Sequence, residues 1–251
     1  LLGVVEEMAD GKLWLRPVDK RIRKDMPISD VGTAKRGDLV LAEPTGRPPR
    51  ISARVTDILG DPFAPRSFSM IAIHKHGIPH VFPDAVEEEA VTASALPLHA
   101  EKREDLRHLP IVAIDPSDAR DHDDAVWATP DEDEANPGGF RAIVAIADVS
   151  YYVRPGSALD KEARKRGNSV YFPDLVVPML PHQLSSDMCS LRAGQDRAAM
   201  ACHLVINAAG KVTSWRFSRA IIRVAAVLAY EDAQAAIDGK ADHPMLDIAL
   251  R

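Results

Sequence analysis

Residues 111–129 read IVAIDPSDARDHDDAVWAT and place five aspartates between two apolar runs. The run at 111–114 is short and continuous, which is typical of a strand that is covered on both faces. The apolar sequence resumes at Ala125, immediately behind the acids. We therefore expect a loop that is anchored at both ends by strands, with its carboxylates at Asp115, Asp118, Asp121, Asp123 and Asp124.

The density of carboxylates in this loop matters because like charges repel. Two carboxylates about 5 Å apart repel by roughly 3 kcal/mol at an effective dielectric constant of about 20. A loop that holds them apart in solvent avoids this cost, and the charge count alone favours that interpretation. Asp121 and Asp123, however, are two residues apart and share one face of an extended chain. Carboxylates that are held together in this way raise their own pKa values or bind cations.

The ligand types indicate which cation such a loop would bind. Oxygen ligands without a complement of Cys and His favour Mg²⁺, or Mn²⁺ as a substitute, over Zn²⁺. A calcium EF-hand is excluded, because Arg120 stands in the place of its Gly and Val126 in the place of its terminal Glu.

The composition is that of a globular chain without a marked nucleic-acid signature. The 251 residues are 46% hydrophobic and 27% charged, and the net charge is −6, so there is no excess of basic residues. The lack of excess positive charge counts against a protein that binds the phosphate backbone of nucleic acid, unless cations or further segments supply positive charge. No apolar stretch approaches the ~18 residues of a membrane span, and no export signal is visible. Cys189 and Cys202 lie in no CxxC pair, so we expect packing residues in a reducing cytoplasm.

The N-terminal residues 1–60 alternate short apolar runs with turn signals. LLGVVEEM and KLWLRPV flank the hairpin signal ADG, and DLVLAEP and RISARVTDIL flank TGRPP. This pattern predicts a small closed barrel of the OB type. Trp14 is the only aromatic residue in this segment, and we expect it to be scaffold rather than a base-stacking platform.

Residues 61–108 and 109–251 differ in the secondary structure that their sequence patterns predict. The first segment predicts helices near 64–78 and 83–96 and then a polar linker at 97–110. His74, His76 and His80 are not interpreted as a metal cluster, because no Cys or carboxylate joins them at ligand spacing. The second predicts strands at 111–114, 123–129 and 141–149, a helix capped by Ser157 and Gly167, a hairpin over 202–222 and a helix from about 228. Strands followed by helices in this order indicate an α+β domain.

The string AIDPSDARDHDDAV, followed by VAIADVSYYVRPG and GNSVYFP, resembles the catalytic (RNB-type) domain of the ribonuclease II/ribonuclease R family, and is closer to ribonuclease R. The resemblance covers most of residues 109–230, and residues 1–60 resemble, more weakly, the cold-shock-type barrel that precedes that domain. It implies an OB-fold barrel at 1–60, a helical connector at 61–108 and the N-terminal portion of the RNB domain at 109–251. Because the family's domain is much longer, we expect this chain to be a fragment.

The resemblance implies a processive exoribonuclease that uses Mg²⁺ to degrade RNA from its 3′ end to nucleoside 5′-monophosphates. The expected partner is the 3′ end of single-stranded RNA, and the expected protein is a cytoplasmic monomer that contacts no membrane. Asp115, Asp121 and Asp124 match the metal-binding acids, Asp123 would bind metal or orient the attacking water, and Asp118 lies outside the pattern. The expected RNA-binding residues are Tyr171, Tyr230, Arg164 and Arg166.

Two alternatives to the exoribonuclease remain at this stage. One is a catalytically silent RNA-binding relative, although binding alone does not need all four acids. The other is an Asp-rich metal enzyme that acts on a different phosphate ester. The family's arginine-bearing segment and its C-terminal S1 domain are not in the sequence, so the parent protein is expected to be the nuclease and the fragment alone is not.

Overall fold

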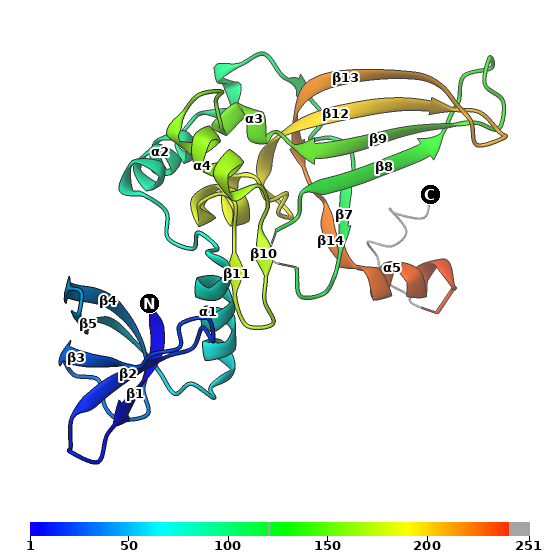
Figure 1. Cartoon of the computed structure of the whole chain (residues 1–251). Helices are drawn as coiled ribbons and strands as arrows, with labels where there is room; N and C mark the ends of the chain where they lie inside the picture. The colour runs from blue at the N-terminus through cyan, green and yellow to red at the C-terminus, as the bar shows by residue number, and fades with distance from the viewer. Residues whose placement is uncertain (120, 241–251) are drawn as a thin grey trace. The chain divides into compact units, whose positions relative to one another are not determined.

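The computed structural model describes residues 1–119 and 121–240 (Figure 1). The chain divides into two compact units. The barrel unit comprises residues 1–81 together with 168–178, and the sheet unit comprises residues 82–167 and the chain from Met179 onward. The segment 168–178 thus lies between two stretches of the sheet unit in the sequence but belongs to the barrel unit.

The barrel unit is built on a closed five-stranded barrel with the strand order β1-β2-β3-β5-β4. Its inward side chains, among them Val5, Leu15, Val40 and Ala53, are almost completely buried, and closure leaves no strand edge open. The predicted OB-type barrel is confirmed. Its strands are β1 (Leu2–Glu7), β2 (Leu13–Pro17), β3 (Met26–Asp30), β4 (Leu39–Arg47) and β5 (Arg50–Gly60).

Helix α1 (Pro65–His76) follows the barrel, as predicted. Proline suits its first turn, and Gly77 ends it at φ 64°, in the left-handed region that residues with a Cβ seldom adopt. The hairpin of β10 (Val170–Tyr171) and β11 (Val176–Val177) lies in the same unit. The Ser69 hydroxyl on α1 donates a hydrogen bond to Asp174 in this hairpin.

The sheet unit contains a seven-stranded mixed sheet with the order β14-β7-β8-β9-β12-β13-β6. The central strands are antiparallel, whereas β14 runs parallel to β7 and β6 runs parallel to β13. The α+β architecture is therefore confirmed. Its strands are β6 (Glu104–Asp105), β7 (Val112–Asp115), β8 (Asp124–Pro130), β9 (Phe140–Ala147), β12 (Asp196–Ile206), β13 (Val212–Arg223) and β14 (Ala226–Ala229).

Helices pack mainly on one face of this sheet, which Figure 1 shows with α2, α3 and α4 gathered at one end of β9 and β12. Helix α4 begins where the Ser157 hydroxyl accepts a hydrogen bond from the Asp160 amide at 3.1 Å, which confirms the predicted N-cap. No helix in residues 1–119 or 121–240 is long and apolar enough to cross a membrane. The helical segments of this unit are α2 (Asp84–Ser94), η1 (Leu98–Ala100), α3 (Val149–Tyr152), α4 (Ala158–Arg166), η2 (Leu184–Met188) and α5 (Tyr230–Ile237).

The prediction of a polar surface linker at 97–110 is wrong for two of its residues. The side chain of Arg103 is completely buried, and Leu106 is packed in the core. The physical reason is a carboxylate, Asp148, that follows β9 and is itself buried. A buried charge requires a partner of opposite charge, and Arg103 and Asp148 are such partners for each other.

Candidate functional site

The acid loop, residues 115–124, is anchored at both ends, as the sequence predicted. Strand β7 ends at Asp115 and strand β8 begins at Asp124, while Ala113 and Ala125 just outside the loop are buried. The two strands pair through Val112 and Val126. The backbone of Asp123 is held as well, because its carbonyl accepts a hydrogen bond of 2.8 Å from the Ala147 amide. The loop therefore returns from one strand of the sheet into the next, with the backbone of Asp123 and Asp124 held by pairing to β9.

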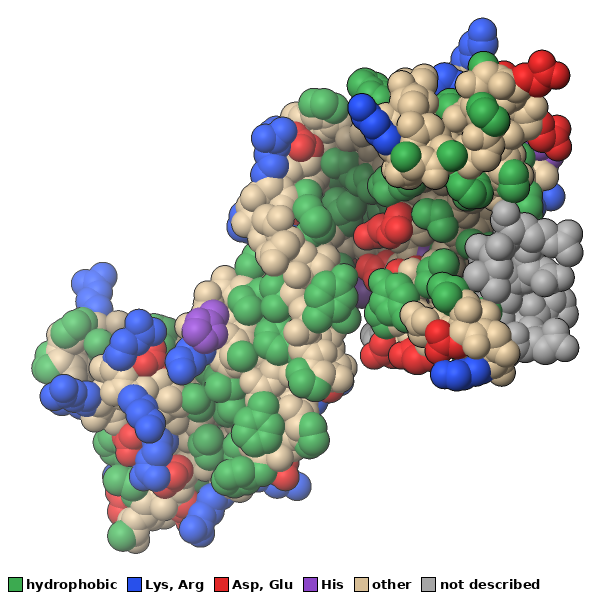
Figure 2. Space-filling model, turned by 90° about the vertical axis from the view of Figure 1, so that its right-hand side faces the viewer, with side chains coloured by type: hydrophobic (Ala, Val, Ile, Leu, Met, Phe, Trp, Pro, Cys, Tyr) green, Lys and Arg blue, Asp and Glu red, His purple; other side chains and the backbone are tan. Residues whose placement is uncertain are grey.

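The charges of this loop converge on Asp123. Partial burial of its carboxyl raises its pKa, and the negative charges of Asp121, Asp124 and Asp115 raise it further, in that order. His122 opposes them more weakly. Asp118, which lies outside the motif, is exposed. The view in Figure 2 shows a group of acidic side chains on the sheet unit. Four of the five aspartates thus form one electrostatic group around the carboxyl of Asp123.

His122 and Ser190 hold the loop from inside. Nδ1 of His122 lies 2.7 Å from Oδ2 of Asp115, so one carboxylate oxygen of the site is oriented by the imidazole. The His122 amide donates to Oγ of Ser190 at 3.1 Å, and the Leu191 amide donates to the His122 carbonyl at 2.8 Å. Ser190 is completely buried. Sequence reasoning missed Ser190, since a single serine 66 positions from Asp124 carries no local signal.

The donor set of the acid loop fits a hard divalent cation. Carboxylate oxygens are the ligands that Mg²⁺ and Mn²⁺ prefer, and a cation would offset the repulsion that raises the pKa of Asp123. In the part of the chain that the structure describes, no three His, Cys, Asp or Glu side chains are arranged so that they could bind a metal ion together. The metal assignment therefore rests on the donor chemistry and on the convergent charge.

Tyr230 is placed beside the acid loop by strand pairing. The parallel ladder of β14 and β7 sets Ala229 opposite Asp115, and Tyr230 is the next residue along the chain. Its ring is more than half exposed at the start of α5. Tyr171 is also exposed and lies in the barrel unit, on β10.

The two arginines predicted to contact RNA differ in their surroundings. Arg164 is exposed and pairs with Asp160 at 3.0 Å, one turn earlier on α4. The guanidinium of Arg166 is buried, pairs with Glu162 at 3.0 Å and stacks 3.5 Å from the centre of the Phe82 ring. Of the two, Arg164 is the side chain that a phosphate could reach without disturbing a packed contact. Both assignments stay predictions.

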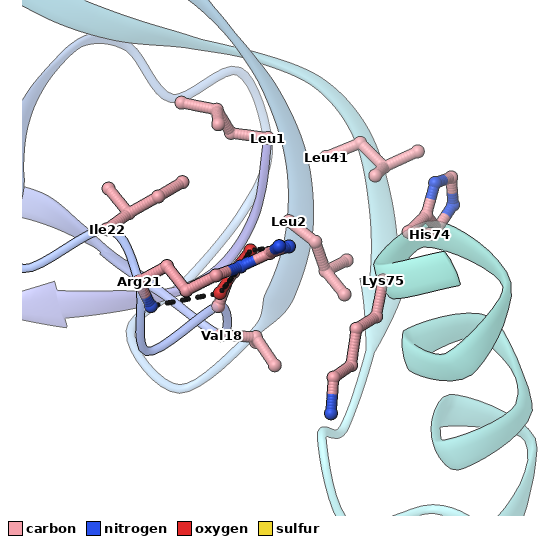
Figure 3. A pocket seen from close by; sticks show the side chains of 9 residues that line it. Leu1, Leu2, Val18, Arg21, Ile22, Leu41, His74 and Lys75 are labelled. Atoms are coloured by element: carbon pink, nitrogen blue, oxygen red, sulfur yellow. Dashed lines mark hydrogen bonds and ion pairs between the residues drawn. The ribbon is translucent and has the colours of Figure 1, made fainter. Parts of the chain in front are cut away.

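A cavity of about 210 Å³ lies in the barrel unit, between the first strands and α1 (Figure 3). Leu2, Val18 and Leu41 give it apolar walls, and Arg21 at its side is already paired with Asp19 at 2.7 Å. The ring of His74, also in its lining, makes an edge contact with His80 at 5.0 Å. None of the residues predicted to take part in catalysis lines this cavity.

Two protein families match the chain. The RNB domain matches residues 103–248, and the cold shock domain matches residues 14–83. The first match contains the acid loop, and the second contains most of the barrel.

Individual relatives show the same relationship. Ribonuclease R of Vibrio parahaemolyticus is 44% identical over 236 residues, which cover 91% of this chain and 28% of that protein. RNase R of Mycoplasma genitalium, solved in complex with double-stranded RNA, superposes with a TM-score of 0.82 at 25% identity over 99% of this chain and 45% of that one. Yeast Ssd1, described as a pseudonuclease, superposes with a TM-score of 0.66 at 18% identity over 98% of this chain and 32% of that one, which shows the fold alone. The chain spans less than a third of the length of its Vibrio relative.

Proposed function

Since this chain belongs to the family of RNB-domain proteins, we propose that it forms part of a processive 3′-to-5′ exoribonuclease that hydrolyses RNA to nucleoside 5′-monophosphates with Mg²⁺. The observation that carries the proposal is the convergence of Asp115, Asp121 and Asp124 on the carboxyl of Asp123. Carboxylates that lie this close together repel one another when no cation is bound, and a bound cation offsets that repulsion. The 44% identity to a ribonuclease R supports the same conclusion.

The four acids divide the work of phosphodiester hydrolysis. Asp115, Asp121 and Asp124 would hold the cations, and Asp123 would hold a cation or orient the water that attacks the phosphorus. Bound divalent cations supply activation of water and neutralisation of the charge on the attacking and leaving oxygens. His122 keeps Asp115 in one orientation through its 2.7 Å contact. Water adds to the phosphorus, the bond to the 3′ oxygen of the preceding nucleotide breaks, and that oxygen takes up a proton.

The RNA strand would be gripped by aromatic and basic side chains. Tyr230 follows the residue opposite Asp115 and is exposed, which suits a ring that stacks on the terminal nucleotide. Tyr171 would stack farther along the strand, with Arg164 and Arg166 near phosphates. Residues 1–81 hold 13 Lys and Arg against 10 Asp and Glu, and Figure 2 shows basic side chains spread over this unit. We propose that the protein engages the 3′ end of single-stranded RNA as a cytoplasmic monomer.

The silent RNA-binding relative remains the second candidate, because the fold is shared with the pseudonuclease Ssd1. The experiment that separates the two uses the complete open reading frame and a 5′-labelled single-stranded RNA with Mg²⁺. Wild type should shorten the RNA from its 3′ end to a small limit product, and chelation with EDTA should stop the reaction. The Asp124→Asn variant should lose at least a hundredfold in rate, whereas the matched Asp118→Asn variant should retain the wild-type rate. RNA that is bound but not shortened by wild type would establish the silent relative instead.

A further inference from the structure

One end of the five-stranded barrel is formed by two connections that strand register brings together. Strands β3 and β5 are parallel neighbours, with Ile28 opposite Ala53, so both strands begin at the same end of the barrel. The loop of residues 18–25 leads into β3, and the tip of residues 47–50 joins β4 to β5. Since neighbouring strands lie about 4.8 Å apart, the loop and the tip lie close to each other.

Helix α1 returns to the same end of the barrel. Lys75, in its last turn, lines the cavity of the barrel unit together with Arg21 of the loop (Figure 3). Hydrogen bonds from Arg21 are the main cause that lowers the pKa of Asp19 to about 2, and the positive charge of Lys75 lowers it slightly further. Lys75 therefore lies close to the loop. We call the loop 18–25, the tip 47–50 and Lys75 the basic end of the barrel.

Positive charge is concentrated at this end. The loop reads VDKRIRKD and the tip reads RPPR, so the two connections hold six Lys and Arg against two Asp. Lys75 adds a further positive charge. The opposite end of the barrel is balanced, with three basic and three acidic residues in its connections, 8–12, 31–38 and 61–64.

Most cations of the basic end have no carboxylate partner. Arg21 is the exception, since it pairs with Asp19 at 2.7 Å. On the strands of the barrel, by contrast, Arg16 and Arg54 pair with carboxylates at 2.6 and 3.1 Å. The exposed cations of the basic end that have no ion-pair partner among residues 1–119 and 121–240 are Lys20, Arg23, Lys24, Arg47, Arg50 and Lys75.

The tip 47–50 holds two of these cations against each other. Arg47 and Arg50 lie directly opposite in the antiparallel ladder, where like charges destabilise the pair. Gly46, at φ 90°, fixes the approach of the two strands, because a Cβ at this position would clash with the carbonyl oxygen of Arg50. A bound anion would offset the repulsion between the two guanidinium groups.

The chemistry of the basic end fits phosphates rather than bases. Guanidinium groups bind phosphate through two parallel hydrogen bonds, and an ammonium group binds it as a point charge. Stacking of bases needs aromatic side chains, and Trp14 on β2 is the only aromatic residue in residues 1–60. OB-type barrels usually bind nucleic acid on the face of their second and third strands. The basic end is a different surface with a different chemistry.

A polypeptide partner fits the basic end less well than RNA does. The centre of a protein interface is usually apolar or aromatic. The only aliphatic side chains of the loop and the tip, apart from the prolines, are Val18 and Ile22, and both are partly buried. Several cations side by side instead match a ligand that carries a negative charge on every unit, as the backbone of RNA does.

We propose that the basic end of the barrel binds the sugar-phosphate backbone of RNA without reading its bases. The inference rests on the proposed function in one respect, which is that the substrate is RNA. It adds a second surface of contact to the acid loop and assigns it to the barrel unit. Charge contacts that do not depend on base sequence let a protein slide along a polynucleotide. Such a surface therefore suits an enzyme that moves along its substrate.

Two pairs of adjacent residues with the same composition test the proposal. Arg23→Gln/Lys24→Gln removes an arginine and a lysine from the basic end, and Lys35→Gln/Arg36→Gln removes the same two residue types from the opposite end. Both double variants change the net charge equally. Both should keep the wild-type thermal midpoint, because all four side chains are exposed and without an ion-pair partner among the described residues.

RNA binding is measured by fluorescence anisotropy with labelled oligo-uridine and the protein expressed from the complete open reading frame. EDTA is present, so that binding is followed without hydrolysis. Each phosphate contact that is lost should reduce the slope of log K against log salt concentration by about 0.7 for a single strand. Arg23→Gln/Lys24→Gln should therefore reduce the slope by about 1.4, and Lys35→Gln/Arg36→Gln should leave it at the wild-type value. Oligo-adenosine should give the same result, because no base is read.

Several outcomes would overturn the proposal. An unchanged slope in Arg23→Gln/Lys24→Gln would show that the basic end does not bind RNA, and an equal reduction in both double variants would reflect net charge alone. A reduction with oligo-uridine but not with oligo-adenosine would indicate contacts to bases. An unchanged slope together with lost binding of polyglutamate would identify an acidic polypeptide as the ligand.

The outcome is independent of the nuclease activity. A protein that does not shorten RNA but shows the expected slopes would contradict the proposed hydrolysis and support the basic end as an RNA-binding surface. A protein that shortens RNA, with equal slopes in wild type and both variants, would support the hydrolysis and contradict the inference about the barrel.

Discussion

The guanidinium of Arg103 donates a hydrogen bond of 2.9 Å to Oδ2 of Asp148, and neither side chain reaches solvent. The same carboxylate accepts from Arg219 at 3.0 Å and from the Ser150 hydroxyl at 2.7 Å. Arg103 also lies 4.6 Å from the centre of the Tyr151 ring. Since the Asp148 amide bonds to β12 and the adjacent Ala147 amide bonds to Asp123, this network supports the strand end next to the acid loop.

Removal of the Asp148 carboxylate should destabilise the protein strongly. Asp148→Ala leaves the buried Arg103 with only the partly exposed Glu101, at 3.5 Å, as a carboxylate partner among the described residues, and breaking a buried pair in this way costs about 3–5 kcal/mol. The free energy of unfolding in urea, measured by circular dichroism, checks the expectation. Glu43→Gln is the control, because it removes an exposed ion pair with Arg54 and should cost less than about 1 kcal/mol. Equal effects of the two substitutions would contradict a supporting role for the buried network.

Local signals in the sequence identified elements and their ends, but not their neighbours. Ser157 and Gly77 are cap residues whose chemistry acts within a few positions, so both helix ends were predictable. The apolar run before Asp115 predicted strand β7 for the same reason. The parallel pairing of β7 with β14 joins residues more than a hundred positions apart, and no local pattern specifies it.

The candidate site shows the same division between local and distant information. The four acids were predictable from the resemblance and from their spacing, because they lie in one loop. The burial of Arg103 was not, since its segment is polar and its partner lies 45 positions away. Ser190 was missed for a similar reason, as its hydroxyl meets His122 only after the chain folds back from β11 through η2.

Tyr230 should contribute to RNA affinity and little to stability. Its ring is exposed beside Asp115, and stacking of a base on an aromatic side chain is worth about 1–3 kcal/mol, or roughly a 5- to 150-fold change in affinity. In the protein expressed from the complete open reading frame, Tyr230→Ala should raise KM within this range for a short single-stranded RNA, and Tyr230→Phe should retain wild-type KM. Ile237→Ala, an exposed position on the same helix, is the control. An unchanged KM in Tyr230→Ala would remove this residue from the RNA path.

Acid should weaken the contact between β6 and β13. The guanidinium of Arg216 donates to both oxygens of Glu104 at 2.9 Å and holds the pKa of Glu104 at about 2, below its usual 4.5. Because the folded-state pKa is depressed, the stabilisation is complete above the unfolded value and is lost as the pH falls from 4.5 towards about 2.

The partial exposure of this pair limits the effect to about 1 kcal/mol. Between about pH 5.5 and about pH 3, the Glu104→Gln variant should therefore lose less unfolding free energy than wild type does. Urea titrations at the two pH values measure the difference. Glu43→Gln should lose as much as wild type, and an identical loss in all three proteins would show that Glu104 is not linked to acid stability.

Ser190 should position the acid loop through its hydroxyl. Ser190→Ala removes the acceptor of the His122 amide in a completely buried setting, and an orphaned buried donor costs about 1–3 kcal/mol. The imidazole partner of the Asp115 carboxylate would be held less firmly, so kcat of the protein expressed from the complete open reading frame should fall while KM for RNA stays constant. Ser185→Ala is the matched control, because the Ser185 hydroxyl lies buried in the preceding segment η2 without a hydrogen-bond partner among the described residues. That variant should be as stable and as active as wild type, and a Ser190→Ala variant that behaves in the same way would show that the loop does not depend on this hydrogen bond.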